Sequence, residues 1–159
     1  MLEEPNLDHI NIWQQNTRKS LTIQLATVHS VEDKYDVMCI QEPYFDFQSL
    51  SRATGVWTSV YPSGFSRATD GPHPRALTLI HTRISTNSWV QVPVNSLDIV
   101  AVQFTSDKGV LNVYNIYNDC SHSDTIRKLD VHMASRVVAR SGPSDVNIDT
   151  GLSSQVQTR

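Results

Sequence analysis

"YDVMCIQEPYF", residues 35–45, joins an almost wholly apolar run to the triplet Gln41-Glu42-Pro43. The apolar run, residues 36–40, is typical of a strand that is buried on both faces. Pro43 fits a sharp turn directly after that strand, because its ring cannot continue the hydrogen-bonded ladder. Glu42 is then left at the strand end, where a carboxylate is either a solvated charge or a metal ligand.

The segment before this strand has the pattern of a strand followed by a helix. Residues 9–15, "HINIWQQ", alternate apolar and polar side chains, which predicts a strand. Apolar residues then recur at helical spacing between residues 18 and 31, namely Leu21, Leu25 and Val28. Asn16 or Thr17 is able to cap this helix. A strand, a helix and a second strand in this order indicate an α/β fold.

The rest of the chain is rich in short strands and ends with a helix. Residues 49–54 are compatible with a short helical turn, and residues 62–74 form a loop rich in proline and glycine. The predicted strands have alternating or apolar patterns and lie at residues 56–61, 75–81, 89–94, 97–105 and 110–117. Asp107-Lys108-Gly109 predicts a hairpin turn between the last two. The clearest helix spans residues 121–140, where Ser121 and Asp124 have the spacing of a capping box.

The composition is that of a single globular domain. With 159 residues, 39% of them hydrophobic and 18% charged, the chain can bury one core and is short for two domains. No apolar stretch reaches the length of a membrane span, and the acidic N-terminus does not resemble a secretory signal. Cys39 and Cys120 are far apart and are interpreted as buried free thiols, which favours an intracellular setting.

The charge is distributed unevenly along the chain, whose net charge is −3. Residues 1–46 carry eight acidic and three basic side chains, whereas residues 47–97 carry four arginines and one aspartate. A locally basic middle is compatible with a polyanionic partner, although scattered arginines are also common as simple surface charge. The charge pattern therefore leaves nucleic-acid binding open.

Polar side chains follow three of the predicted strands. Gln15-Asn16 ends the first, Glu42 follows the second, and Tyr117-Asn118 ends the strand "VLNVYNIY". Functional sites in sheets flanked by helices gather at such carboxyl ends. A carboxylate suits Mg²⁺, an amide can orient the ion or a phosphate, and a phenol can donate to a phosphoryl oxygen. Taken singly, each residue has a plainer explanation, as a helix cap, a solvated charge or a packed aromatic side chain.

Four stretches, in this order, resemble one family of nucleases. They are "INIWQQNTRKS" (10–20), "YDVMCIQEPYF" (35–45), "RALTLIHTRI" (75–84) and "LNVYNIYNDCSHSDTI" (111–126). Over residues 9–146 the chain is similar to the endonuclease domain of non-LTR (LINE-type) retrotransposons, within the endonuclease/exonuclease/phosphatase superfamily, and most of all to its fungal versions. The resemblance implies a four-layer α/β sandwich of mixed β-sheets flanked by helices, of which this chain holds roughly the first half.

The resemblance also implies an activity and the residues that support it. The family cleaves a DNA phosphodiester with Mg²⁺ as its cofactor, which implies DNA as the partner and the nucleus as the place of action. By motif match, Glu42 and Asn16 belong to the metal site, and Tyr117 and Asn118 belong to the catalytic groups. The basic residues assigned to nucleic-acid contacts are Arg18, Arg67 and Arg75.

Two motifs of the family are absent from the sequence. Neither Gly-Asp-Phe-Asn nor Ser-Asp-His occurs in it, and none of the six histidines matches the catalytic histidine of the family. Asp149, near the expected place of the first motif, stands in the unrelated stretch "NIDTG". Residues 1–8 and 147–159 are interpreted as tails.

The absent motifs lead to two alternative expectations. The first is a truncated Mg²⁺-dependent DNA endonuclease domain that is inactive or weakly active, because groups that act in the transition state are missing. The second is a non-catalytic remnant or a DNA-binding module. In either case we expect self-association through sheet surface that the missing half leaves unpaired.

Overall fold

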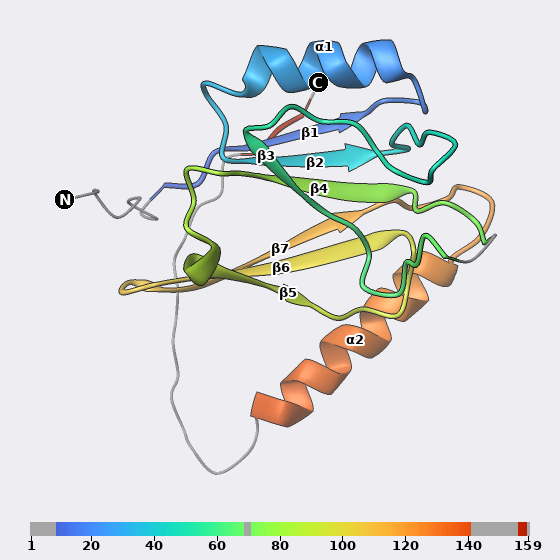
Figure 1. Cartoon of the computed structure of the whole chain (residues 1–159). Coiled ribbons are helices and arrows are strands. Elements are labelled where there is room, and N and C mark those ends of the chain that lie inside the picture. The colour runs from blue at the N-terminus through green and yellow to red at the C-terminus, as the bar shows by residue number, and fades with distance from the viewer. Residues whose placement is uncertain (1–8, 69–70, 141–155, 159) are drawn as a thin grey trace.

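The computed structural model describes residues 9–68, 71–140 and 156–158, with two stacked β-sheets and one helix outside each of them (Figure 1). The first sheet has the strand order β3-β4-β2-β1-β8. Its strands are β1 (Ile12–Asn16), β2 (Val37–Gln41), β3 (Trp57–Val60), β4 (Ala76–His81) and β8 (Val156–Thr158). The second sheet, in the order β5-β6-β7, consists of β5 (Trp89–Val92), β6 (Ile99–Ser106) and β7 (Gly109–Ile116). The helices are α1 (Leu21–Val31), α2 (Asp124–Arg140) and the short 3₁₀ helix η1 (Thr86–Ser88).

β2 is the middle strand of the first sheet, and all five of its residues are buried, as the apolar run predicted. It pairs in parallel with β1, and α1 forms the crossover that parallel pairing requires. β4 runs antiparallel to β2 on its other side. The register places Asn16 of β1 opposite Gln41 of β2, so both strands end at the same edge of the sheet.

Three apolar clusters hold the layers together. Between the sheets, Val37 of β2 belongs to the same buried cluster as Phe104 of β6. α1 covers the outer face of the first sheet, where Val28 shares a cluster with Ile40. α2 covers the outer face of the second sheet, and its Leu129 packs against the third cluster. The predicted four-layer α/β sandwich is therefore confirmed, with a second sheet of three strands.

The second sheet covers the inner face of the first, and β7 is one of its two edge strands. In the part of the chain that the structure describes, no further strand pairs with β7. Its sequence, GVLNVYNI, contains none of the charged or proline residues that commonly protect a sheet edge. Self-association through this edge remains a prediction.

α1 begins later than its predicted start. Its N-cap is Ser20, whose hydroxyl oxygen accepts a hydrogen bond from the backbone N–H of Ile23 at 3.3 Å. The predicted caps, Asn16 and Thr17, are therefore wrong. The reason is that the chain makes a tight turn between the end of β1 and the first helical residue.

α2 also begins later than predicted, at Asp124. Ser121 does not form the predicted capping box. Instead, its backbone N–H and its hydroxyl both donate to Asp119 Oδ1, at 2.9 and 2.7 Å. A carboxylate two residues away competes successfully for the serine, because such local bonds form readily in turns.

Several other expectations differ from the structure. Residues 49–54 form no helix. Cys39 is buried as predicted, but Cys120 is exposed. Residues 156–158 of the predicted tail form β8, parallel to β1, whereas Asp149 lies outside the described residues. No helix in the described ranges has the length and apolar character needed to cross a bilayer.

Candidate functional site

Glu42 directly follows β2 and has an uncommon backbone conformation, with φ at 48°. Its N–H donates to the carbonyl oxygen of Arg75 at 2.9 Å. Its own carbonyl oxygen accepts hydrogen bonds from Lys19 N–H at 2.8 Å and from the Thr17 hydroxyl at 2.9 Å. A left-handed conformation is strained for a residue with a Cβ, and such strain is concentrated at functional sites. The neighbouring segments therefore hold Glu42 in a conformation that it would not adopt by itself.

The turn between β1 and α1 lies beside Glu42 and is strained in the same way. Arg18 and Lys19 have φ values of 50° and 59°. Asn16 is exposed, and its Oδ1 accepts a hydrogen bond from Arg18 N–H at 2.8 Å. Thr17 N–H donates to the carbonyl oxygen of Gln41 at 2.9 Å, which fastens the turn to the end of β2. Asn16 therefore lies on the neighbouring strand end, as predicted for a partner of Glu42.

Tyr117 reaches Glu42 from the other sheet. It follows β7 directly, and its N–H donates to the carbonyl oxygen of Asp98 at 2.8 Å. Interaction of its hydroxyl with the nearby Glu42 carboxylate, followed by burial and the negative charge of Glu42, raises the pKa of the phenol. The structure thus brings together two of the predicted site residues that lie 75 positions apart in the sequence.

Arg75 lies in the same cluster but is ion-paired within the protein. Its Nε and Nη2 donate to the two carboxylate oxygens of Asp98 at 2.8 and 2.7 Å. Its Nη1 donates to Asp119 Oδ2 at 2.8 Å, and its guanidinium carbon lies 4.7 Å from the centroid of the Tyr117 ring. The hydrogen bonds to Asp98 raise the pKa of Arg75. Contact between Arg75 and DNA remains a prediction, because two carboxylates occupy its guanidinium.

Asp119 is held in its ionised form. Hydrogen bonds from the hydroxyl and N–H of Ser121, followed by the bond from Arg75, lower the pKa of this carboxyl group. We call Glu42, Arg75 and Tyr117, with the two aspartates that bind Arg75, the rim network. It joins the ends of both sheets at the side where the arrowheads of β1 and β2 point (Figure 1).

A second polar network lies beneath the rim network, inside the sandwich. Gln41 Nε2 donates to Asn115 Oδ1 at 2.8 Å. Asn115 Nδ2 in turn donates to the carbonyl oxygen of Leu77 at 2.8 Å and lies 3.3 Å from Thr78 Oγ1. We call Gln41, Thr78 and Asn115 the interior network. All three are buried, and their bonds connect β2 and β4 of the first sheet to β7 of the second.

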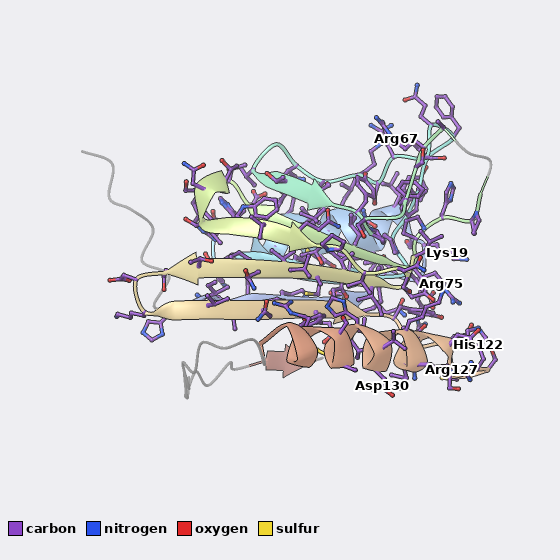
Figure 2. The ribbon with its side chains drawn as sticks, turned by 90° about the horizontal axis from the view of Figure 1, so that it is seen from below. Lys19, Arg67, Arg75, His122, Arg127 and Asp130 are labelled. Atoms are coloured by element: carbon purple, nitrogen blue, oxygen red, sulfur yellow. The ribbon has the colours of Figure 1, made fainter. Side chains whose placement is uncertain are left out.

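The remaining predicted residues lie near the rim network or apart from it. Arg18 is exposed in the strained turn, and Asn118 is exposed directly after Tyr117. Arg67 is exposed on the loop between β3 and β4, and Figure 2 shows it apart from Arg75. The assignment of these residues to catalysis or to DNA stays a prediction.

Sequence reasoning did not identify Asp98, Asp119 or the interior network. Asp98 and Asp119 follow no motif, and only the fold brings them to Arg75. Asn115 had a visible signal, since it is an amide two and four positions after Val113 and Leu111, on the face of the strand that is otherwise apolar. A buried amide needs hydrogen-bond partners, so such a position predicts a second polar residue opposite it.

The described residues offer limited ligation for a metal ion. Among the side chains of residues 9–68 and 71–136, no group of three or more His, Cys, Asp or Glu residues is arranged to hold one. Glu42 supplies one carboxylate, and Asn16 supplies an amide oxygen on the adjacent strand end. This donor set fits Mg²⁺, which keeps several waters and binds through one or two carboxylates together with substrate phosphates.

Comparison with known proteins identifies the architecture. No protein-family model matches the sequence, and no curated protein matches it. Among solved structures, the chain is similar to the endonuclease domain of TRAS1, a telomere-specific non-LTR retrotransposon, with a TM-score of 0.53 and 18% sequence identity. The chain has the fold of that endonuclease domain. The similarity covers 84% of this chain and 56% of the TRAS1 structure, so the chain spans little more than half of that domain.

Proposed function

We propose that this chain carries the metal-holding part of a DNA endonuclease site of the non-LTR retrotransposon type. The observation that carries the proposal is the strained Glu42 directly after β2, with the Tyr117 hydroxyl close to its carboxylate. The shared fold with a retrotransposon endonuclease domain supports it. DNA is the proposed substrate and the nucleus the proposed place of action.

In this proposal the residues have distinct roles toward a DNA phosphodiester. Glu42, with Asn16 beside it, would hold a Mg²⁺ ion, which when bound stabilises negative charge on phosphate oxygens. The Tyr117 hydroxyl is protonated at neutral pH, as an ordinary phenol is, and would donate its single proton to a phosphoryl oxygen when Mg²⁺ occupies the Glu42 carboxylate. Asn118 follows Tyr117, and Arg18 lies two residues after Asn16; both are exposed. In this proposal they would contact the DNA backbone next to the phosphodiester.

We expect the 159-residue chain to have little or no cleavage activity. The sequence contains neither Gly-Asp-Phe-Asn, expected to position the attacking water and the developing charge, nor Ser-Asp-His, expected to supply the catalytic histidine. Loss of one transition-state donor reduces a rate about 10²–10³-fold, and loss of several groups that act together should leave almost nothing. Metal binding is therefore the property to measure first.

Titration calorimetry with Mg²⁺ tests the role of Glu42. The Glu42→Gln variant should bind Mg²⁺ at least about tenfold more weakly than the unmodified chain, because the amide removes the anionic ligand. Glu32→Gln is the matched control, since Glu32 ends α1 at the opposite end of β2. Equal Mg²⁺ binding by all three proteins would remove Glu42 from the proposed site.

A non-catalytic DNA-binding module is the second candidate, favoured by the lack of a three-ligand metal cluster among the described residues. The two candidates differ in their dependence on Mg²⁺. Nicking of supercoiled plasmid that needs Mg²⁺ and disappears in Glu42→Ala supports the endonuclease. Salt-sensitive DNA binding that is indifferent to Mg²⁺, without nicking, supports the module.

A further inference from the structure

A hollow of about 690 Å³ opens directly beside Glu42. It is lined by Pro43, Tyr44 and Phe45, the three residues that follow Glu42, and by the loop residues 72–75 and 96–98. Lys19 and Lys128 complete the lining. We call this hollow the Phe45 pocket. Its volume falls in the range of small-molecule sites.

The Phe45 pocket has a positive lining in a chain whose net charge is −3. Its cations are Lys19, Arg75 and Lys128, and its single carboxylate, Asp98, is ion-paired with Arg75. Lys19 and Lys128 are exposed, and neither ammonium group has an ion-pair partner among the side chains of residues 9–68 and 71–136. Two free cations at one hollow favour an anionic ligand.

Part of the pocket lining is aromatic. The rings of Phe45 and His73 are stacked, with centroids 4.6 Å apart and an interplanar angle of 24°. Phe65 meets the Phe45 ring edge-on at 5.8 Å. His73 is exposed and is oriented by a 3.1 Å contact between its Nε2 and Ser49 Oγ. A flat ring can therefore extend the existing stack.

The pocket wall is held in place by a buried amide of α1. Gln24 is fully buried, and its Oε1 accepts a hydrogen bond from Tyr44 N–H at 2.8 Å. Its Nε2 donates to the carbonyl oxygen of Arg52 at 2.6 Å and to Ser51 Oγ at 2.9 Å. Because these bonds are desolvated, they fix the loop that carries Phe45 before any ligand binds.

We propose that the Phe45 pocket binds one unpaired nucleotide of a DNA strand, with its phosphate on Lys19 and Lys128 and its base stacked on the exposed ring of His73, which itself stacks on Phe45. A ligand that is both anionic and flat matches the two halves of the lining. The proposal rests on the proposed function, because the pocket adjoins Glu42 and a strand held at Glu42 can continue into it. A free nucleoside monophosphate has the same chemistry, and the experiment distinguishes it from a strand.

Fluorescence anisotropy with a labelled oligothymidylate, and with a strand of the same length made of abasic units, tests the proposal. His73→Ala should weaken binding of the oligothymidylate at least about fivefold and leave binding of the abasic strand unchanged, because only the former has a base to stack. Lys128→Gln should weaken both strands and reduce the salt dependence of binding. Lys34→Gln is the control, because it makes the same charge change at the other end of β2. It should alter neither the binding of the two strands nor its salt dependence.

The outcomes separate the pocket from the proposed function. If His73→Ala weakens binding of the oligothymidylate and of the abasic strand equally, His73 acts through folding and not by stacking on a base. That result would overturn the proposed nucleotide site. His73→Phe, which keeps a stacking ring, should restore the preference for the oligothymidylate. Displacement of the oligothymidylate by thymidine monophosphate at equal concentration would assign the pocket to free nucleotides instead. If the unmodified chain binds no DNA, the proposed function fails, and this proposal fails with it.

Discussion

The interior network and the rim network use the ends of the same three strands, yet they are built for different purposes. β2, β4 and β7 each contribute a buried residue to the interior network and a second residue, one to three positions away, to the rim network. The interior amides satisfy one another and their carbonyl partners between the sheets. The rim groups are half-exposed and, except for Tyr117, ionisable carboxyl or guanidinium groups, and Glu42 is strained. One network joins the sheets, whereas the other presents chemical groups at their edge.

The comparison shows how a short shift along a strand changes what a polar group contributes. Gln41 is buried and paired, so its amide contributes to the uniqueness of sheet packing. Glu42, the next residue, is half-exposed and lies close to the Tyr117 hydroxyl. Removing a group from the interior should therefore change folding, and removing a group from the rim should change the site.

Asn115→Leu should have the largest effect on stability. Asn115 is 2% exposed, and its loss leaves the Gln41 amide and the Leu77 carbonyl without their partner. Each stranded polar group costs about 1–3 kcal/mol, so the free energy of unfolding should fall by about 3 kcal/mol or more. Urea unfolding followed by circular dichroism measures it. Asn112→Leu, on the same strand but half-exposed, should lose less than about 1 kcal/mol; similar losses would remove the distinction between the networks.

Arg75→Met should have an intermediate effect that depends on pH. The loss at neutral pH should be about 1–2 kcal/mol, mostly from the bidentate pair with Asp98, after allowance for the 31% exposure of Arg75. The pKa of Asp119 is lowered in the folded state, first by Ser121 and then by Arg75. The ionised Asp119 therefore stabilises the fold above the unfolded pKa of about 3.9, and this contribution is lost as the pH falls. The difference from the unmodified chain should therefore shrink between about pH 4 and pH 2.

The same variant has a readout at the site. The positive charge of Arg75 lowers the pKa of Tyr117 against the other contributions, so Arg75→Met should raise that pKa further, as measured by NMR of labelled tyrosine. Arg83→Met is the control, because Arg83 pairs with Asp36 at the opposite end of β4. If Arg83→Met shifts the pKa of Tyr117 by the same amount, the effect of Arg75 on Tyr117 does not depend on its place beside the ring.

Glu42→Gly should have the smallest effect on stability, and of the opposite sign. Glycine adopts φ near 48° without strain, which offsets its greater freedom in the unfolded chain. We expect the free energy of unfolding to be unchanged or raised by up to about 1 kcal/mol, while Mg²⁺ binding is lost. Glu42→Ala, which lacks the carboxylate but keeps the strain, should be less stable than Glu42→Gly. The reverse order in thermal unfolding would show that the site stores no backbone strain.

Much of the candidate site was visible in the sequence because strand ends are local features. The apolar run before Glu42 predicts a buried strand, and Pro43 predicts its end, so the place of the carboxylate follows from neighbouring residues alone. Asn16 and Tyr117 were found in the same way. Arg75 shows the limit of this reasoning, since an arginine in a basic stretch predicts DNA contact, but its actual partners are Asp98 and Asp119, 23 and 44 positions away.

The order of apolar and polar residues in this chain was sufficient to predict an α/β fold, most of its strands and three residues at strand ends, because burial and periodicity act over short stretches. The sandwich itself was predicted from the resemblance to a nuclease family. The tertiary structure alone decided which charges neutralise one another, where the chain turns into a left-handed conformation, and that Tyr117 meets Glu42. Those features depend on contacts between the two sheets, and a side chain carries no local signal of a partner that folding brings from far along the chain.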